Sequence, residues 1–401
     1  MVRRTFFLVL LIVGTSLSAG AQSLTPQWTF TARGPFIGSA ATANGFVYAG
    51  SLDSTLYALD LTTGAVRWTF RAAGPVRSTP CVDGSVLYLN AGGALTALDA
   101  ASGAVRWRFA TKGEKIYTPY GYADYYQSSP VVRDGTVYFG SGDGHLYAVN
   151  AKNGALRWKF NTGDVVHASP VLDSARVYIG AFNGVMYALE KSTGKEVWRF
   201  KTVGHRFFPK GEVQGTAALS DGLVTVGARD YNIYALDAAK GYAHWNRTFP
   251  RGWALSLTAD DTALYTGTSD DDVIVAFEAG TGTELWRTDL RFNTFGRAAL
   301  DDSLLYIGTL LGQVHALDRR TGRIAATFLT EGFRNNHARF FSHPDSISKA
   351  RFYSIVQSPE GYIEGLYALG AIFSDVLRTG SSLIVTSTDG RVYCLDKNEN
   401  K

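Results

Sequence analysis

Two charged residues occupy a position at which the rest of this 401-residue chain carries small hydroxyls. The position recurs along the sequence, and its occupants are Ser39, Thr79, Ser129, Ser169, Thr216, Ser256, Arg297 and Asp375. A guanidinium and a carboxylate in adjacent units form either a charged ligand site or an ion pair that joins the two units. The residue types alone leave both interpretations open.

A second series, two residues earlier, is polar on one side only. Its members are Ile37, Arg77, Gln127, His167, Gln214, Ala254, Phe295 and Phe373. Residues i and i+2 lie on the same face of a strand, so both series should face the same space. The consecutive polar members indicate a site for an asymmetric ligand or partner, although a solvated rim explains them equally well.

Other motifs give no support to catalysis. The chain has no neighbouring cysteines, no His-x-x-x-His pair and no Gly-x-Ser-x-Gly elbow. One acidic or amide side chain recurs in every unit, at Asp60, Asp99, Asn150, Glu190, Asp237, Glu278, Asp318 and Asp396. Such repetition favours a role in hairpin turns. The run 270–272 is acidic but lacks the spaced oxygen ligands of a calcium site. We therefore predict neither catalytic residues nor metal ligands.

Repeated units must position these residues. Segments 46–70 and 136–160 are clearly related, and further copies end at Trp107, Trp198, Trp245 and Trp286. Units of about 40 to 50 residues, each with four short strands and Gly-containing turns, are typical of propeller blades. The first strands begin near residues 37, 77, 127, 167, 214, 254, 295 and 373. The sequence therefore predicts an all-β fold, an eight-bladed β-propeller of four-stranded antiparallel blades.

The two ends of the chain should close the ring together. The last copy, 373–396, contains only three strands, whereas the segment 26–31 around Trp28 has no blade of its own. Pairing the N-terminal strand with 391–396 completes the last blade and removes two open sheet edges. In this arrangement Cys81 and Cys394 are too far apart for a disulfide, so we expect two free thiols.

Three insertions interrupt the repeats, at 111–126, 202–213 and 330–372. Each joins the outermost strand of one blade to the innermost strand of the next, so all three should emerge on one face. They are rich in aromatic and basic residues, including Tyr120 and Arg339, and 358–369 should form a short helix. Long loops on a rigid scaffold often carry function. The candidate ligand or partner face therefore comprises Arg77, Tyr120, Gln127, His167, Gln214, Arg297, Arg339 and Asp375.

The N-terminus resembles a secretion signal. Arg3 and Arg4 precede the apolar run 6–13, and 19–21 reads Ala-Gly-Ala, a small-residue cleavage site. We predict a signal peptide at 1–21, one propeller domain at 22–401, and a periplasmic or secreted monomer without a transmembrane segment. The formal charge is +4, of which two units come from the signal, so nucleic acid is not an expected partner.

The run 56–68, Leu-Tyr-Ala-Leu-Asp-x-x-Thr-Gly-x-x-x-Trp, resembles the pyrroloquinoline-quinone (PQQ) type repeat. One branch of that family is the quinoprotein alcohol dehydrogenases, which the resemblance associates with an adjacent cysteine disulfide, a calcium ion and an Asp base. Another branch is the outer-membrane assembly factor BamB and its non-enzymatic relatives, which are similar in length to this chain. The lipidated cysteine of BamB is missing here, because Cys81 and Cys394 are the only cysteines.

Three classes of function follow from these observations. The first is an exported binding or scaffold propeller with a protein partner or small ligand on the insertion-bearing face and no cofactor. The second is an oxidoreductase that uses PQQ with calcium, or another metal. The third is a carbohydrate-binding or hydrolytic propeller that uses the Tyr-rich insertion 111–126.

Overall fold

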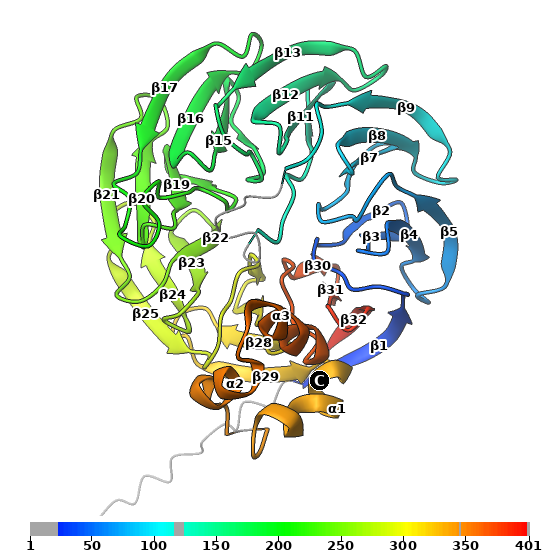
Figure 1. The fold of residues 1–401 in the computed structure, drawn as a ribbon, viewed down its shortest axis with the longest axis vertical. Helices are drawn as coiled ribbons and strands as arrows, with labels where there is room; N and C mark the ends of the chain where they lie inside the picture. Colours follow the sequence, from blue (N-terminus) through cyan, green and yellow to red (C-terminus); the bar gives the residue numbers. More distant parts are fainter. Residues whose placement is uncertain (1–22, 116–123, 345, 399–401) are drawn as a thin grey trace, which may run out of the picture.

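A computed structural model describes residues 23–115, 124–344 and 346–398. Eight four-stranded antiparallel sheets stand as blades around a central channel (Figure 1), which confirms the predicted eight-bladed propeller. The middle strands lie between neighbouring blades and are therefore apolar on both faces. Strand β11 (Thr136–Gly140), for example, is buried along its whole length. In contrast, the outermost strand β13 (Leu156–Asn161) exposes most of its residues and buries Trp158.

The strands follow one another outward from the channel in each of the first seven blades. Blade one contains β2 (Ala41–Ala43), β3 (Phe46–Gly50), β4 (Thr55–Asp60) and β5 (Val66–Arg71), and blade two contains β6 (Cys81–Asp83), β7 (Val86–Ala91), β8 (Ala94–Asp99) and β9 (Val105–Ala110). Blade three contains β10 (Val131–Arg133), β11, β12 (His145–Asn150) and β13, and blade four contains β14 (Val171–Leu172), β15 (Arg176–Gly180), β16 (Val185–Glu190) and β17 (Glu196–Lys201).

Blade five contains β18 (Ala218–Ser220), β19 (Leu223–Gly227), β20 (Asn232–Asp237) and β21 (Ala243–Thr248). Blade six contains β22 (Ala254–Ala259), β23 (Ala263–Thr268), β24 (Val273–Glu278) and β25 (Glu284–Asp289), and blade seven contains β26 (Ala299–Leu300), β27 (Leu304–Gly308), β28 (Gln313–Asp318) and β29 (Ile324–Leu329). Blade eight contains β30 (Leu377–Thr379), β31 (Ser382–Thr386), β32 (Arg391–Asn398) and, outermost, β1 (Ser23–Thr31).

Blade eight closes the ring through both ends of the chain, as the sequence predicts. Strand β1 pairs with β32 antiparallel, with Trp28 opposite Cys394 and Thr31 opposite Arg391. The register shifts between Pro26 and Trp28, because proline has no N–H to give to the ladder. Cys81 and Cys394 are both free thiols.

The repeated tryptophans join each blade to the next. The indole N–H of Trp158 donates to the Lys191 carbonyl oxygen at 3.1 Å, and the indole of Trp28 donates to the Leu61 carbonyl oxygen at 2.9 Å. The same bond is made by Trp68, Trp107, Trp198, Trp245 and Trp286. The recurring acids serve turns, since the Asp60 carboxylate accepts from the N–H groups of Thr62 and Thr63. Both series are therefore structural, and for the acids this confirms the role in turns that their repetition predicts.

The hydroxyl series joins the inner ends of the blades around the channel. The Thr79 hydroxyl accepts from the Ser39 N–H at 3.1 Å, the Ser129 hydroxyl from the Thr79 N–H, and the Ser169 hydroxyl from the Ser129 N–H, each at 2.9 Å. Asp375 replaces the hydroxyl in blade eight. Its carboxylate accepts from the Arg297 N–H at 2.8 Å and also pairs with the Arg297 guanidinium at 2.9 Å. The two charged exceptions thus form an ion pair between blades seven and eight.

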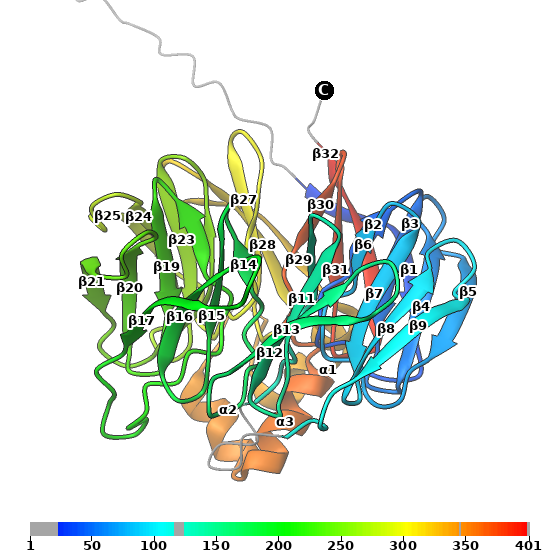
Figure 2. The ribbon, with the colours of Figure 1, turned by 90° about the horizontal axis from the view of Figure 1, so that it is seen from above.

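Helices α1 (Glu331–Phe340), α2 (Lys349–Val356) and α3 (Pro359–Ala368) lie on one face of the ring (Figure 2). The predicted helix corresponds to α3, whose N-cap Ser358 accepts from the Gly361 N–H. Helices α1 and α2 were not expected, although Thr330 and Ser348 cap them in the same way. None of the helices in the described part of the chain is long and apolar enough to cross a membrane.

The first strands are shorter than the sequence suggests. In blade three the first strand is predicted to begin near residue 127, whereas β10 begins at Val131. Pro130 has no N–H, and the Ser128 hydroxyl accepts from the Gly140 N–H at 2.8 Å in place of a ladder bond. The segments before these first strands still line the channel.

Candidate functional site

Residues 124–126, at the end of the first insertion, lie across one end of the channel. The Tyr126 hydroxyl donates to the Phe373 carbonyl oxygen at 2.6 Å, just before the first strand of blade eight. The Tyr125 ring packs 4.6 Å from Phe373 and 6.1 Å from Phe295, measured between ring centroids. The apolar half of the second series therefore holds the aromatic end of this insertion. From the opposite face, the channel forms an open space of about 760 Å³ that Arg297 and Asp375 line.

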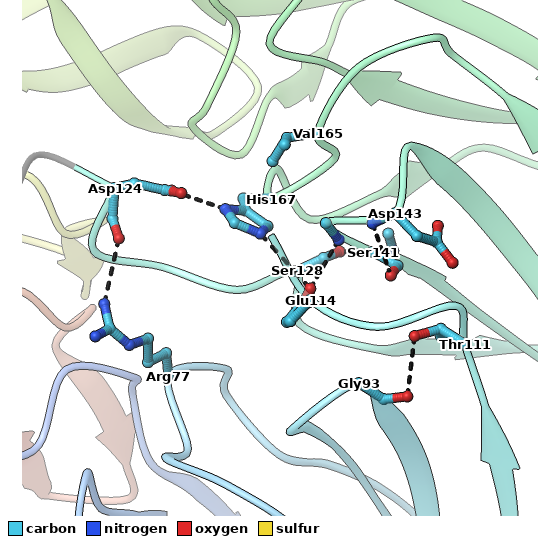
Figure 3. Close-up of polar contacts among 12 residues, drawn as sticks. Arg77, Gly93, Thr111, Glu114, Asp124, Ser128, Ser141, Asp143, Val165 and His167 are labelled. Atoms are coloured by element: carbon cyan, nitrogen blue, oxygen red, sulfur yellow. Dashed lines mark hydrogen bonds and ion pairs between the residues drawn. The ribbon is translucent and has the colours of Figure 1, made fainter. Parts of the chain in front are cut away.

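The polar half of the second series holds the same insertion through His167. The His167 side chain is 4% exposed, and its Nδ1 lies 2.7 Å from Asp124 Oδ1 (Figure 3). Its Nε2 lies 3.7 Å from Glu114 Oε2. Burial lowers the pKa of His167, but the hydrogen bonds and charges of Asp124 and Glu114 outweigh it and raise the pKa to about 9. At neutral pH the buried His167 imidazolium therefore joins the two described segments of the insertion, 111–115 through Glu114 and 124–126 through Asp124.

A polar chain continues from Asp124 toward blade five. Gln214 donates from Nε2 to Asp124 Oδ1 at 3.4 Å and accepts from Arg229 at 2.6 Å. The guanidinium of Arg229 is 1% exposed and lies 5.6 Å from the ring of Trp253. On the other side, the Arg77 guanidinium donates to the Asp124 carbonyl oxygen at 3.2 Å. These contacts hold Asp124 from both sides at the end of the channel.

The structure brings most of the predicted face residues together, but as supports of this insertion. Arg77, Gln127, His167, Gln214 and Asp375 surround a space of only about 40 Å³ beneath Tyr126. Arg297 lies in the open channel on the other side. Arg339 is exposed on α1, where its guanidinium covers the Phe340 ring at 5.3 Å. Tyr120 lies outside the described residues.

A second pocket, larger than the 40 Å³ space beneath Tyr126, opens on the insertion-bearing face. It has a volume of about 470 Å³, and half of its twelve lining residues are aromatic. Its lining residues are Tyr125, Phe208, Trp253, Asp270, Asn293, Phe295, Tyr353, Val356, Gln357, Ser358, Pro359 and Tyr362. Every one of the three insertions contributes, through Tyr125, Phe208 and the segment 353–362. The three insertions therefore form one site with blades six and seven.

Sequence reasoning did not single out the central residues of this pocket. Of the eight tryptophans, seven occupy the repeated position and Trp253 does not. That departure from the repeat is the signal that points to Trp253. Asn293 carries no such signal in the sequence, because its interest as a binding residue comes from its burial in the folded protein. Asn293 is 4% exposed, and its Oδ1 has no hydrogen-bond partner among the described residues.

Comparisons with known proteins identify the family. A sequence model of the PQQ-like family described as "Outer membrane protein assembly factor BamB" matches residues 19–190, 161–267 and 183–401. The chain belongs to this family. The resemblance carried by the repeats is thereby confirmed. No curated protein matches the sequence.

Solved structures share the fold at low sequence identity. BamB from Moraxella catarrhalis superposes with a TM-score of 0.70 at 20% identity, over 93% of this chain and 99% of that one. The computationally designed Ika8 protein gives 0.69 at 15% identity, over 93% and 100%. The quinohemoprotein alcohol dehydrogenase ADHIIG from Pseudomonas putida HK5 gives 0.63 at 12%, over 94% and 77%. At these identities the similarity concerns the propeller fold.

The donor set of this BamB-family chain does not fit a calcium–quinone group. Calcium takes six to eight oxygen ligands. The channel carboxylates instead face cations of the protein, since Asp375 pairs with Arg297 and Asp124 with His167. No group of three or more metal-ligating side chains occurs in the described part of the chain. We therefore derive no chemistry through such a group.

Proposed function

We propose that this protein is an exported, non-catalytic binding propeller, and that a ligand or partner binds at the aromatic pocket of the insertion-bearing face. One observation carries the proposal: all three insertions supply walls to the same pocket. Insertions that merely covered the channel end would need no common cavity. Pockets of about 300–1,000 Å³ with aromatic walls and a few polar groups are typical binding sites.

The charged residues near the channel favour binding over catalysis. A general base must be able to reach the substrate, and a nucleophile needs an activating neighbour. His167 is buried between two carboxylates, and Asp375 is paired with Arg297. The proposal therefore includes no cofactor and no metal. Reconstitution with PQQ and calcium should give no dye-linked oxidation of alcohols, and turnover in that assay would contradict the non-catalytic assignment.

The proposal places the protein in the periplasm or outside the cell, as a monomer without a lipid anchor. The signal-like segment 1–21 supports export, and Cys81 and Cys394, the only cysteines, both lie within the blades. Cell fractionation with mass spectrometry of the N-terminus should yield an exported chain that begins at Gln22. A cytoplasmic chain that still begins at Met1 would contradict export.

Site-specific photo-crosslinking tests the binding face. A photoreactive phenylalanine analogue replaces Tyr353, at the pocket rim, or Phe207, in the second insertion; these side chains are 41% and 52% exposed. Both positions should give the same identified adduct, and Trp253→Ala should abolish it. The matched control is Tyr242, which is 51% exposed on blade five outside the pocket. Equal crosslinking from Tyr242 would contradict the proposed face.

A further inference from the structure

We infer that the aromatic pocket binds a neutral carbohydrate, and this inference rests on the proposed function. The pocket combines three properties that together select this ligand class: flat apolar walls, a buried acceptor without a partner among the described residues, and protein charges of both signs nearby. Each property restricts the ligand in a different way.

The walls offer stacking surfaces. Tyr353 and Tyr362, from α2 and α3, stack with their ring centroids 6.0 Å apart and an interplanar angle of 24°. Trp253 and Phe295 are nearly parallel, with an angle of 15°. Tyr353 is 41% exposed and therefore accessible from solvent. A pyranose ring presents a flat patch of C–H groups that packs against aromatic faces, while its hydroxyls remain at the edges. Aromatic rings of this kind present a large apolar surface together with a polar group.

One buried polar atom of the pocket lacks a hydrogen-bond donor among the described residues. Asn293 is 4% exposed, and its Oδ1 accepts no hydrogen bond from the described residues. A buried acceptor without a partner costs about 1–3 kcal/mol, so a ligand that donates to it gains affinity. Asp270 lines the same pocket with a side chain that is 44% exposed. Asn293 and Asp270 both line this cavity, and their oxygens suit a ligand that is rich in hydroxyl groups.

Charge separates a carbohydrate from the other class of ligand that packs on aromatic rings, the organic cations. The Lys349 ammonium lies 3.6 Å from Asp270 Oδ1 and 2.5 Å from Asp272 Oδ1. The Arg229 guanidinium covers both Phe208 and Trp253, at 5.7 Å and 5.6 Å from the ring centroids. A cationic ligand would thus meet two cations of the protein, and an anionic ligand would meet Asp270. A neutral ligand avoids both repulsions.

The same pocket is suited to binding and not to hydrolysis. Glycoside hydrolysis uses a pair of carboxylates on either side of the scissile bond. Asp270 is the single carboxylate among the described residues that line the pocket. The volume of about 470 Å³ accommodates a short oligosaccharide.

Calorimetric titration tests the inference on the whole mature protein. The probes are maltotriose, cellotriose and tri-N-acetylchitotriose, with tetramethylammonium as the cationic comparison. We expect at least one trisaccharide to bind and tetramethylammonium not to bind. Tyr353→Ala should weaken that binding about tenfold, which corresponds to the loss of one aromatic contact. Asn293→Leu should do the same while leaving the thermal midpoint unchanged or higher, because it removes an unsatisfied buried acceptor. Tyr242→Ala, an exposed aromatic outside the pocket, is the matched control.

The outcomes distinguish this inference from the proposed function. If no trisaccharide binds, or if Tyr353→Ala and Tyr242→Ala affect binding equally, the carbohydrate assignment is wrong. Tighter binding of tetramethylammonium than of any trisaccharide has the same consequence. In these cases the proposed binding face still stands if Trp253→Ala abolishes the crosslinked adduct, and it fails with the inference if it does not.

Discussion

The two ends of the central channel are built on different principles. At the open end the blades contribute equivalent residues, and these residues bond to the neighbouring blade: the Thr79 hydroxyl accepts from Ser39, and the Ser129 hydroxyl from Thr79. At the other end the three insertions break the repeat and converge on one aromatic pocket. Repeated side chains therefore hold the ring together, whereas side chains without counterparts are available for a ligand.

The one-sided second series shows how the two principles meet. Its polar members His167 and Arg77 bond to the side chain and the carbonyl oxygen of Asp124. Its apolar members Phe295 and Phe373 pack against Tyr125. The asymmetric partner suggested by the series is thus the insertion of the same chain. The following predictions, from the largest expected effect to the smallest, test this division between ring and site.

Removing β1 should have the largest effect, because it opens the ring. A chain that begins at Ala32 loses the whole ladder with β32 and the burial of Leu24 and Trp28. We expect the free energy of unfolding to fall by roughly 5 kcal/mol or more, measured by urea denaturation. Thr29→Ala, an exposed change in the same strand, should cost less than about 0.5 kcal/mol. An unchanged transition in the truncated chain would show that the ring does not depend on this closure.

The two kinds of tryptophan should separate stability from binding. Trp158 is 9% exposed and hydrogen-bonded across the blade interface, so Trp158→Ala should cost about 3–5 kcal/mol. Trp253 is only partly buried, so Trp253→Ala should cost roughly 2 kcal/mol and abolish binding at the pocket. Thermal denaturation and the crosslinking assay measure the two effects. A larger loss of stability from Trp253→Ala than from Trp158→Ala would reverse the comparison.

The His167 network should make stability depend on pH. The folded pKa of about 9 lies above the ordinary value of 6.5, so the imidazolium stabilises the fold fully below about pH 6.5, and this contribution is lost as the pH rises through 9. The lost contribution is on the order of 3 kcal/mol. His167→Gln cannot carry the charge, so its deficit relative to the native protein should shrink between pH 7 and about pH 10. Parallel pH curves for the two proteins would mean that the imidazolium does not hold the insertion.

These comparisons also show what the sequence could and could not predict. The blades, their number and the closure through Trp28 follow from local periodicity, because each unit repeats the same strand and turn signals. The register places Arg297 next to Asp375, but it leaves open whether they pair or form a charged ligand site. The partners of His167 do not follow from the register, since Glu114 and Asp124 lie in an insertion whose path no repeat specifies. The aromatic pocket was also missed, because it depends on how three unrelated insertions fold together around Trp253.

The smallest effect is expected at the one place where the hydroxyl ring contains a carboxylate. Asp375 accepts from the Arg297 N–H, as the hydroxyls do elsewhere, and its ion pair with the guanidinium is additional. The Arg297 side chain is 45% exposed, so water can replace the carboxylate. Asp375→Ser keeps an acceptor for the N–H and should cost less than about 1 kcal/mol, as for other exposed ion pairs. Asp375→Ala removes that acceptor as well and should cost more than Asp375→Ser. Urea denaturation of both variants measures the two losses in the free energy of unfolding. Equal losses would mean that the ion pair, and not the repeated acceptor, joins blades seven and eight, and the open end of the channel would then contain a specialised contact of its own.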